Sequence, residues 1–403
     1  MRNVVFVAPF PLETSIRFSR ALRQLHNIRL LGVFQEPPPQ DAGFDDVVLI
    51  KNGLDAHQIA EGVGLLKRRY GPIHRITGVL EDIQSQLAAV REAFGLPGMS
   101  VDTVMGFRDK GLMKQRVAAA GLRVPRAARV RTDSDVWRAA ELIGFPLILK
   151  PIAGAGSADT YRIDGPDDLL RVLPYLRHVP EASCEEFVEG EEYTFDTICI
   201  EGKPAFMNVA QYLPRPLLAR THEWISPEII TVRDMTQPKL QGGIRLGLGV
   251  LDALHMGTGF THMEWYRKAD GEVVFGEIGC RPGGAHLADQ MNFTCDIDVF
   301  REWARAVCFH TWEAPTERKY NVAIIFKRAL GQGRITRIEG LEAIKARYGQ
   351  WICWENLLKP GQHRRDWKQT LVSDGFLIVR HPDTNVVKAA LKTIVETVVV
   401  RYA

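Results

Sequence analysis

Apolar residues recur along the first hundred positions with a spacing that alternates between that of a strand and that of a helix. Short apolar runs predict strands at 3–8, 28–33, 46–50 and 76–80, and apolar residues three to four positions apart predict helices at 15–25, 56–70 and 82–94. Strands that alternate with helices favour a small doubly wound parallel sheet. The turn after the first strand reads APFPLET rather than G-x-G-x-x-G, so we do not expect a dinucleotide site of that type.

The pattern changes after a linker at 95–100, and two more α/β regions follow. Helices are predicted at 109–120 and 133–143, and then a strand, a glycine loop and a second strand within FPLILKPIAGAGSADTYRI. Antiparallel strands are predicted at 183–187, 193–200 and 203–211, and a long helix at 237–254. In the last region, strands near 322–327, 333–338, 351–355 and 375–380 surround a helix at 340–348, and a final helix closes the chain.

The composition is that of a globular protein with a sizeable core. The chain has 403 residues, of which 46% are hydrophobic and 25% charged, which indicates two or three domains. Its 51 basic and 48 acidic residues leave a formal charge of +3, so no strong field favours nucleic acid or a membrane surface. No apolar stretch approaches the roughly 18 residues of a membrane span, and the apolar run at the start is too short for a secretory signal. The six cysteines form no C-x-x-C pair, so we expect free thiols and a cytoplasmic protein.

One predicted hairpin places two acids face to face. In GFTHMEWYRKADGEVVFGEIG, Asp270 and Gly271 separate two apolar, aromatic-rich runs and predict a two-residue turn. Glu264 then lies opposite Glu277, with Cβ atoms about 5 Å apart, where two carboxylates repel by about 3 kcal/mol at an effective dielectric near 20. A divalent ion with oxygen ligands such as Mg²⁺ would relieve this repulsion. The alternative is that one glutamate is exposed and the other pairs with an arginine, Arg281 or Arg267.

Three further stretches carry candidate chemistry, although each has an ordinary structural interpretation. LILKPIAGAGSADT delivers Lys150 from a buried run into a small-residue loop whose backbone N–H groups can approach oxyanions, or which is only a turn. SCEEFVEGEEYTFDT is a strand interrupted by Gly190, or a solvated acidic hairpin. GFRDKGLMKQRVAAAG is a helix with Lys110 and Lys114 one turn apart, and lysines on a helix surface are usually only solvated.

The order of these four signals is similar to that in the ATP-grasp superfamily. The resemblance covers about residues 105–310, and the preceding α/β region resembles the domain that usually precedes the ATP-grasp core. It implies an α/β protein with an N-terminal doubly wound parallel-sheet domain at 1–100 and an ATP-grasp core at 101–310. This core would divide into a subdomain at 105–190 and a metal-binding subdomain at 191–310. A C-terminal α+β lid or substrate domain at 311–403 would follow.

The resemblance also assigns roles to single residues. ATP phosphates would be held by Lys110 and Lys150 and covered by a loop containing Gly154, Gly156 and Ser157. Adenine would bind at Glu185 and at the backbone of Glu186 and Val188, and the ribose hydroxyls at Glu192. Two metal-binding carboxylates, Glu264 and Glu277, agree with the independent hairpin argument, and Arg281 would stabilise the acyl phosphate or the attacked carboxylate.

One position departs from the family pattern. Many relatives read E-x-N-x-R where this chain has Gly279, so a metal ligand is missing and a water or substrate oxygen would have to replace it. His262, predicted to face Gly279 across the hairpin, is a candidate for that space, or else a partly buried structural histidine.

The implied reaction joins a carboxylate to an amine with ATP and Mg²⁺ or Mn²⁺, through an acyl phosphate. RTHEWISPEI and the C-terminal region resemble L-amino-acid ligases and carnosine-synthase-like enzymes, which makes Glu223 a candidate to bind a substrate ammonium group, or an exposed loop acid. The expected partners are ATP and small-molecule acids and amines, without nucleic acid or membrane; a homodimer is compatible with the sequence. Two alternatives stay open: a biotin-carboxylase-like enzyme, although no biotin-accepting Met-Lys-Met motif is present, and a non-catalytic nucleotide-binding module.

Overall fold

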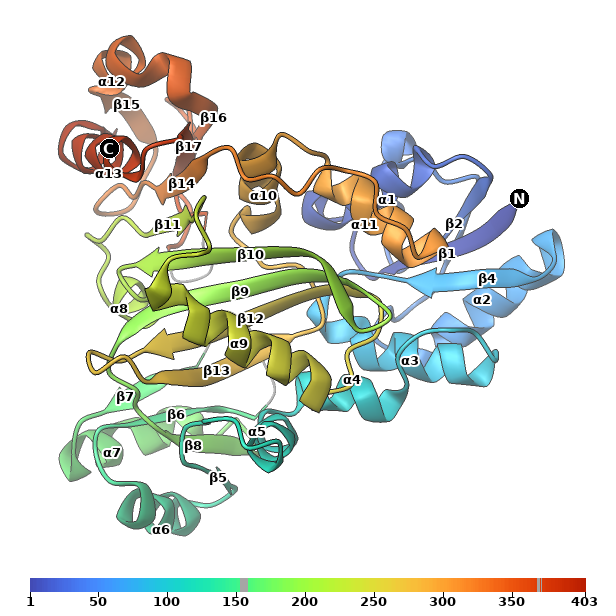
Figure 1. The fold of residues 1–403 in the computed structure, drawn as a ribbon, viewed down its shortest axis with the longest axis horizontal. Helices are drawn as coiled ribbons and strands as arrows, with labels where there is room; N and C mark the ends of the chain where they lie inside the picture. Colours follow the sequence, from blue (N-terminus) through green and yellow to red (C-terminus); the bar gives the residue numbers. More distant parts are fainter. Residues whose placement is uncertain (153–158, 368–369, 371) are drawn as a thin grey trace.

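The computed structural model describes residues 1–152, 159–367, 370 and 372–403. Its N-terminal part is a four-stranded parallel sheet with the strand order β3-β2-β1-β4 (Figure 1). The strands are β1 (Arg2–Ala8), β2 (Ile28–Phe34), β3 (Asp46–Leu49) and β4 (Ile73–Thr77), and the helices are α1 (Glu13–Arg23), α2 (Ala56–Tyr70) and α3 (Gln84–Ala93). Alternate residues of β1 enter different cores, with Val4 and Phe6 in the cluster that contains α1 and Val5 and Val7 in the cluster that contains α2 and α3. The predicted doubly wound sheet is confirmed.

Two predicted elements of this part differ from the structure in position. The strand expected at 76–80 is β4, which begins and ends three residues earlier. The helix expected at 82–94 begins with a 3-10 turn, η2 (Glu81–Ile83), before α3. This turn places Glu81 at the carboxyl end of the parallel sheet.

A small antiparallel sheet follows, with the order β5-β8-β6-β7. Its strands are β5 (Ala127–Val130), β6 (Leu147–Pro151), β7 (Tyr161–Ile163) and β8 (Ala182–Glu186), and α6 (Asp133–Ile143) and α7 (Pro166–Val172) pack on it. The helix expected at 109–120 is α5 (Lys110–Ala119), and the sequence analysis missed α4 (Val101–Arg108) directly before it. Asp109 separates the two helices because its side chain accepts hydrogen bonds from the first backbone N–H groups of α5.

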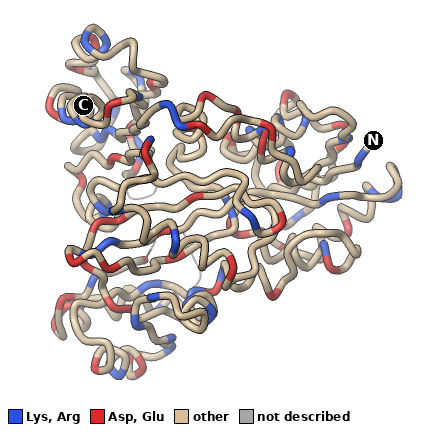
Figure 2. Tube along the Cα trace, viewed as in Figure 1, with Lys and Arg blue, Asp and Glu red and all other residues tan. Residues whose placement is uncertain are grey.

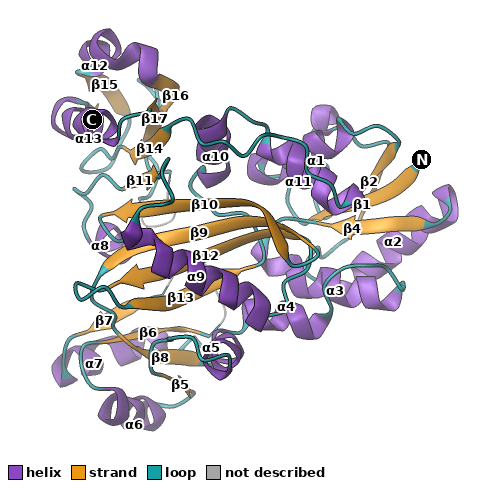
Figure 3. Ribbon diagram, viewed as in Figure 1, coloured by secondary structure: helices purple, strands orange, loops and turns teal. Residues whose placement is uncertain are grey.

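An eight-stranded antiparallel sheet forms the centre of the molecule, with the order β13-β12-β9-β10-β11-β14-β17-β16 (Figure 3). Its strands are β9 (Glu191–Ile200), β10 (Lys203–Leu213), β11 (Glu228–Thr231), β12 (Gly259–Arg267), β13 (Val273–Gly279), β14 (Asn321–Phe326), β16 (Ile352–Leu357) and β17 (Gly375–His381). Helix α9 (Pro238–Ala253) lies across one face. Gly243 and Gly247 allow this helix to pack closely on the sheet because they have no side chain. A Cβ would lie 2.2 Å from the Trp265 ring at Gly243 and 2.2 Å from the Phe195 ring at Gly247.

The C-terminal region shares this central sheet with the core, since β14, β17 and β16 extend it beyond β11. The remaining helices of the described chain are α8 (Pro216–Thr221), α10 (Leu287–Cys295), α11 (Val299–Phe309), α12 (Leu341–Tyr348) and α13 (Thr384–Thr397). Strand β15 (Ile335–Glu339) pairs with β18 (Val399–Tyr402), which follows α13, so the chain ends in a short strand and not in the predicted helix. The regions on either side of the predicted boundary at 310/311 therefore contribute strands to one continuous sheet.

Charge and thiol chemistry agree with the sequence analysis. Figure 2 shows basic and acidic residues interspersed along the chain. All six cysteines are free thiols. Among the helices of the described residues, none has the length and apolar character needed to cross a membrane.

Candidate active site

The hairpin of β12 and β13 places Glu264 directly opposite Glu277, as predicted. Its turn is longer than predicted, because the backbone N–H of Lys268 donates to the carbonyl of Glu272 at 2.9 Å and three residues, 269–271, form the loop. The register then shifts by one residue between Glu264 and Trp265, where Gly276 forms a bulge. The extra loop residue and the bulge compensate each other, so the two-residue turn was wrong while the predicted pair of glutamates is correct.

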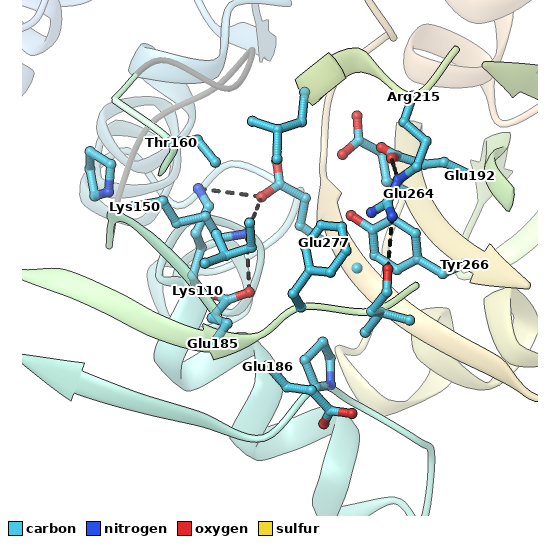
Figure 4. A pocket seen from close by; sticks show the side chains of 17 residues that line it. Lys110, Lys150, Thr160, Glu185, Glu186, Glu192, Arg215, Glu264, Tyr266 and Glu277 are labelled. Atoms are coloured by element: carbon cyan, nitrogen blue, oxygen red, sulfur yellow. Dashed lines mark hydrogen bonds and ion pairs between the residues drawn. The ribbon is translucent and has the colours of Figure 1, made fainter. Parts of the chain in front are cut away.

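Lysines from two other elements contact Glu277 and a third carboxylate, Glu185 (Figure 4). On β6, the Nζ atom of Lys150 lies 3.2 Å from Oε2 of Glu185 and 3.4 Å from Oε2 of Glu277. On α5, Lys110 Nζ lies 3.6 Å from Glu277 Oε2, and Lys114 Nζ lies 2.8 Å from Glu185 Oε1. We call these five residues the lysine–glutamate cluster. Its three ammonium groups exceed its two carboxylates by one positive charge.

The lysines hold both carboxylates of the cluster in the ionised form. Burial alone would raise the pKa of Glu185, but the charges of Lys114 and Lys150 outweigh it and lower this pKa to about 2. Burial is likewise outweighed at Glu277, where Lys110, Lys150 and Lys114 lower the pKa to about 2. Burial lowers the pKa of Lys114, whereas the two carboxylates raise the pKa of Lys150 despite its burial. Lys150 is therefore a permanent cation at neutral pH.

The hinge between the two antiparallel sheets begins where β8 ends at Glu186. Glu185, predicted to bind adenine, directs its carboxylate toward the lysines and also accepts a hydrogen bond of 2.8 Å from the Ser183 hydroxyl. The side chain of Glu186 turns the other way, toward Arg123 at 2.9 Å. Glu185, Glu186 and Val188 nevertheless line one cavity of about 80 Å³ together with Lys110, Lys150 and Glu192.

Glu192 is buried in that cavity and held by Arg215, a residue that the sequence analysis missed. Arg215 Nε lies 3.0 Å from Glu192 Oε2, and another nitrogen of the guanidinium donates to the carbonyl of Val188 at 2.8 Å. The guanidinium also lies over the rings of Phe187 and Tyr266, each centroid 4.8 Å away. Burial and the nearby charge of Glu264 raise the pKa of Glu192 to about 7. In the sequence Arg215 is only one basic residue in a proline-rich turn after a strand, and nothing there indicates its partner.

A second and larger cavity, of about 590 Å³, lies between the N-terminal domain and the central sheet. Glu264 and Glu277 line both cavities, so these two carboxylates stand where the small and the large cavity meet. Arg281 lines the large cavity but not the small one. Charged groups that suit phosphates and a carboxylate are thus arranged on two sides of one pair of acids.

Glu81 of the N-terminal domain fixes the position of Arg281. Its Oε2 lies 2.8 Å from Arg281 Nε, and its Oε1 lies 3.0 Å from Arg108. A Cβ on Gly279 would lie 2.9 Å from Glu81 Oε2, so Glu81 fills the space that an asparagine would need. Of the two alternatives for His262, the one in which it takes this space was wrong. His262 does face Gly279, as predicted, but its Nδ1 lies 2.5 Å from Asp196 Oδ1.

The remaining predicted residues divide into two groups. Gly154, Gly156 and Ser157 lie outside the described residues, and their neighbours Pro151 and Thr160 line the small cavity. Glu223 pairs with Arg364 at 2.6 Å, and neither described cavity has it in its lining. Its position therefore gives no support to a contact with a substrate ammonium group.

Glu264 and Glu277 fit a magnesium ion that shares its ligands with phosphates. Within the described part of the chain, no group of three or more His, Cys, Asp or Glu side chains could hold a metal by itself. Mg²⁺ commonly binds through one or two carboxylates and takes its other ligands from water and substrate phosphates. Two opposed carboxylates beside a cluster whose surplus positive charge suits phosphates are the donor set that this mode of binding requires.

Parts of this chain are similar in sequence to known ligases. No family model matches the chain. An L-arginine-specific L-amino acid ligase of Bacillus subtilis is 27% identical over 239 residues, which cover 58% of this chain and 57% of that protein. Alanine–anticapsin ligase of Bacillus subtilis is 34% identical over 245 residues, covering 55% and 51% of the two chains. The matches thus span about half the length of these relatives.

Solved structures resemble the whole chain. The crystal structure of an L-amino acid ligase from Bacillus licheniformis has a TM-score of 0.81 at 17% identity and covers 100% of this chain and 99% of its own. That of N5-carboxyaminoimidazole ribonucleotide synthetase from Thermotoga maritima has a TM-score of 0.72 at 17% identity, with 100% coverage of both chains. The parallel N-terminal sheet and the two antiparallel sheets therefore have the arrangement that the resemblance implies, and the chain has the ATP-grasp fold.

Proposed function

We propose that this protein is an ATP-dependent, ADP-forming carboxylate–amine ligase whose acid substrate is an amino acid. One observation carries the proposal: Glu264 and Glu277 line both the small cavity, with its lysines, and the large cavity, with Arg281. A phosphoryl group bound on one side of these acids would face a carboxylate bound on the other. The ligase names of the sequence relatives support the same reaction class.

Each residue has a defined task in this proposal. Lys110 and Lys150 bind the phosphates of ATP, and Glu185, the backbone at 186–188 and Glu192 bind its nucleoside. Mg²⁺ or Mn²⁺, held by Glu264 and Glu277, would neutralise phosphate charge. Glu223 receives no task, because it pairs with Arg364 outside both cavities.

The chemistry has two steps. A carboxylate oxygen of the acid attacks the γ-phosphorus, the bond to the bridging oxygen of ADP breaks, and an acyl phosphate forms. The amine then attacks the carbonyl carbon and loses a proton, and inorganic phosphate leaves. Arg281, held by Glu81, stabilises the negative charge on the attacked carboxyl group. Catalysis is otherwise positioning of the reactants by fixed charges.

The test is a screen for phosphate release with ATP, Mg²⁺ and all pairs of amino acids, followed by mass spectrometry of positive reactions. Glu277→Gln protein serves as the inactive control. A dipeptide mass that requires both amino acids and appears with ADP is the expected result. Turnover that needs bicarbonate and biotin, or ATP binding without ADP formation under every condition, would contradict the proposal. The free thiols fit the reducing cytoplasm, where we propose that the enzyme acts.

A further inference from the structure

The large cavity has an apolar wall that the N-terminal domain provides. This wall consists of Pro9, Phe10, Leu12, Leu54, Val79 and Leu80. Three of these side chains are large and unusually exposed: Phe10 at 38%, Leu12 at 50% and Leu54 at 45%. Apolar side chains that remain exposed together in a concave site indicate a ligand surface, because water is a poor partner for them.

The topology of the N-terminal domain explains why these residues meet. Residues 9–12 follow β1, Val79 and Leu80 follow β4, and Leu54 lies in the loop after β3. All three segments leave the carboxyl ends of strands in the same parallel sheet, where β1 and β4 are neighbours and β3 is separated from β1 by β2, and these carboxyl ends lie at one edge of the sheet. In doubly wound domains this edge is where ligands bind.

The wall is continuous with the reacting centre. Leu80 is followed directly by Glu81, whose carboxylate holds Arg281 at 2.8 Å. A substrate whose carboxylate lies at Arg281 would thus have the wall beside it. The acids nearest the wall are already paired, since Glu81 contacts Arg281 and Arg108, and Asp82 lies 3.4 Å from Arg108. The six side chains of the wall itself offer a polar or charged substrate group no hydrogen-bond partner, whereas Thr14, Ser15 and Arg17 line other parts of the same cavity.

We propose, on the basis of the ligase function above, that the acid activated by this enzyme carries a bulky apolar side chain, which packs on this wall. Apolar surface favours such a group by removing it from water, and it disfavours a polar isostere that would lose its hydrogen bonds to water. The wall thereby selects among acids of similar size.

Calorimetric titration of the protein, saturated with ADP and Mg²⁺, tests this inference with matched probes. L-Methionine and L-glutamine have similar size, as do L-leucine and L-asparagine, and L-alanine serves as the small reference. We expect methionine and leucine to bind at least about tenfold more tightly than alanine and than their polar counterparts, since one methylene in an apolar pocket is worth 10-fold or more. Leu54→Asp and Phe10→Ala should each remove most of this preference.

The substituted side chains are exposed, so the fold should tolerate the changes, and Leu142→Asp on α6, where Leu142 is 79% exposed, is the matched control. Binding of glutamine or asparagine as tight as that of methionine or leucine would overturn the inference, as would a preference unchanged in both wall variants. Because this measurement needs no turnover, its outcome is separate from the outcome of the ADP-formation screen.

Discussion

Nζ of Lys150 lies 3.4 Å from Oε2 of Glu277, although the two residues are 127 positions apart and belong to different sheets. Lys150 is the cation assigned to the ATP phosphates, and Glu277 is a carboxylate assigned to the metal. In this arrangement they neutralise each other. These two groups of the proposed nucleotide site are therefore satisfied by each other, and nucleotide binding there must exchange this contact for contacts to phosphate and metal.

Substitution of either opposed glutamate should lower activity to a similar extent, but only one of the two substitutions should lower the stability of the protein. Glu264→Gln and Glu277→Gln should each lower ADP formation at least about a hundredfold, because metal charge stabilisation is worth several kcal/mol. Glu264→Gln relieves repulsion with Glu277 and should not lower the free energy of unfolding. Glu277→Gln takes a partner from Lys110 and Lys150 and should lower it by about 1–3 kcal/mol.

Denaturant unfolding and a coupled ADP assay check both parts of this prediction. Glu272→Gln, on the same hairpin but paired with Lys268, is the control and should keep normal turnover. Near-normal ADP formation in either of the two site variants would remove the metal assignment.

Lys150 and Lys114 both contact Glu185, yet their removal should have different consequences. Lys150 lines the small cavity, so Lys150→Ala should weaken ADP binding by about tenfold or more, with a smaller effect on folding. Lys114 is fully enclosed and pairs with Glu185 at 2.8 Å, so Lys114→Ala should lower the free energy of unfolding by about 3 kcal/mol. Titration with ADP and Mg²⁺, together with denaturant unfolding, separates the two effects. If the two variants lost ADP affinity to the same extent and stability to the same extent, the different roles of Lys150 and Lys114 would be contradicted.

The sequence was sufficient for the pair Glu264 and Glu277 because both lie in one hairpin, where alternation and a turn signal determine which side chains share a face. The loop length was predicted wrongly, and only the bulge at Gly276 restored the register. Local pattern therefore predicts neighbours within a hairpin even where its details are wrong.

Partners that are distant along the chain could not be predicted in this way. The sequence leaves open whether Lys114 is a functional or only a solvated lysine, since its partner Glu185 is 71 residues away. Glu81 likewise contacts Arg281 across 200 residues. A helical period indicates which side chains share a face, and it does not indicate which carboxylate from another sheet will cover that face. Glu81, and not His262, lies beside Gly279 because the N-terminal domain packs against the hairpin there. No single segment of the sequence indicates this contact between domains.

The ion pairs of Glu185 should give the protein a characteristic loss of stability in acid. The pKa of Glu185 is about 2 in the folded chain against an ordinary value of 4.5, so its contribution to stability is complete above about pH 4.5. This contribution, of the order of 3 kcal/mol by the difference in pKa, is lost as the pH falls from 4.5 toward 2. Glu185→Gln should be less stable than the parent near neutral pH, and the difference should shrink in acid.

Urea unfolding from pH 7 to the lowest pH at which the parent is folded measures this difference. Leu142→Gln, an exposed change without a titratable group, is the control. A difference between Glu185→Gln and the parent that stays constant below pH 4.5 would show that the carboxylate does not stabilise the fold through these lysines.

The contact between Arg281 and Glu81 should control how well the acyl phosphate forms. With the acid substrate and ATP present and the amine omitted, hydroxylamine intercepts an acyl phosphate as a hydroxamate that colorimetry detects. Arg281→Ala should lower the initial rate of hydroxamate formation about a hundredfold, or roughly 3 kcal/mol, because the attacked carboxyl group loses its fixed cation. Arg281→Lys should recover part of this loss, since it keeps the charge but not the planar guanidinium that Glu81 holds at 2.8 Å.

Gly279→Ala tests the same contact without changing any charge. The added Cβ would lie 2.9 Å from Glu81 Oε2 and 3.4 Å from Arg281 Cγ, so Glu81 must move and Arg281 must follow it. We expect the hydroxamate rate to fall by about tenfold while ADP still binds normally, because Lys110 and Lys150, which are assigned to the phosphates, are untouched. Gly165→Ala, at an extended position where a Cβ meets nothing within 4 Å, is the matched control and should behave as the parent. If Gly279→Ala retained the parent's rate while Arg281→Ala lost it, Arg281 would act without help from Glu81, and the assignment of Glu81 as its positioning residue would fail.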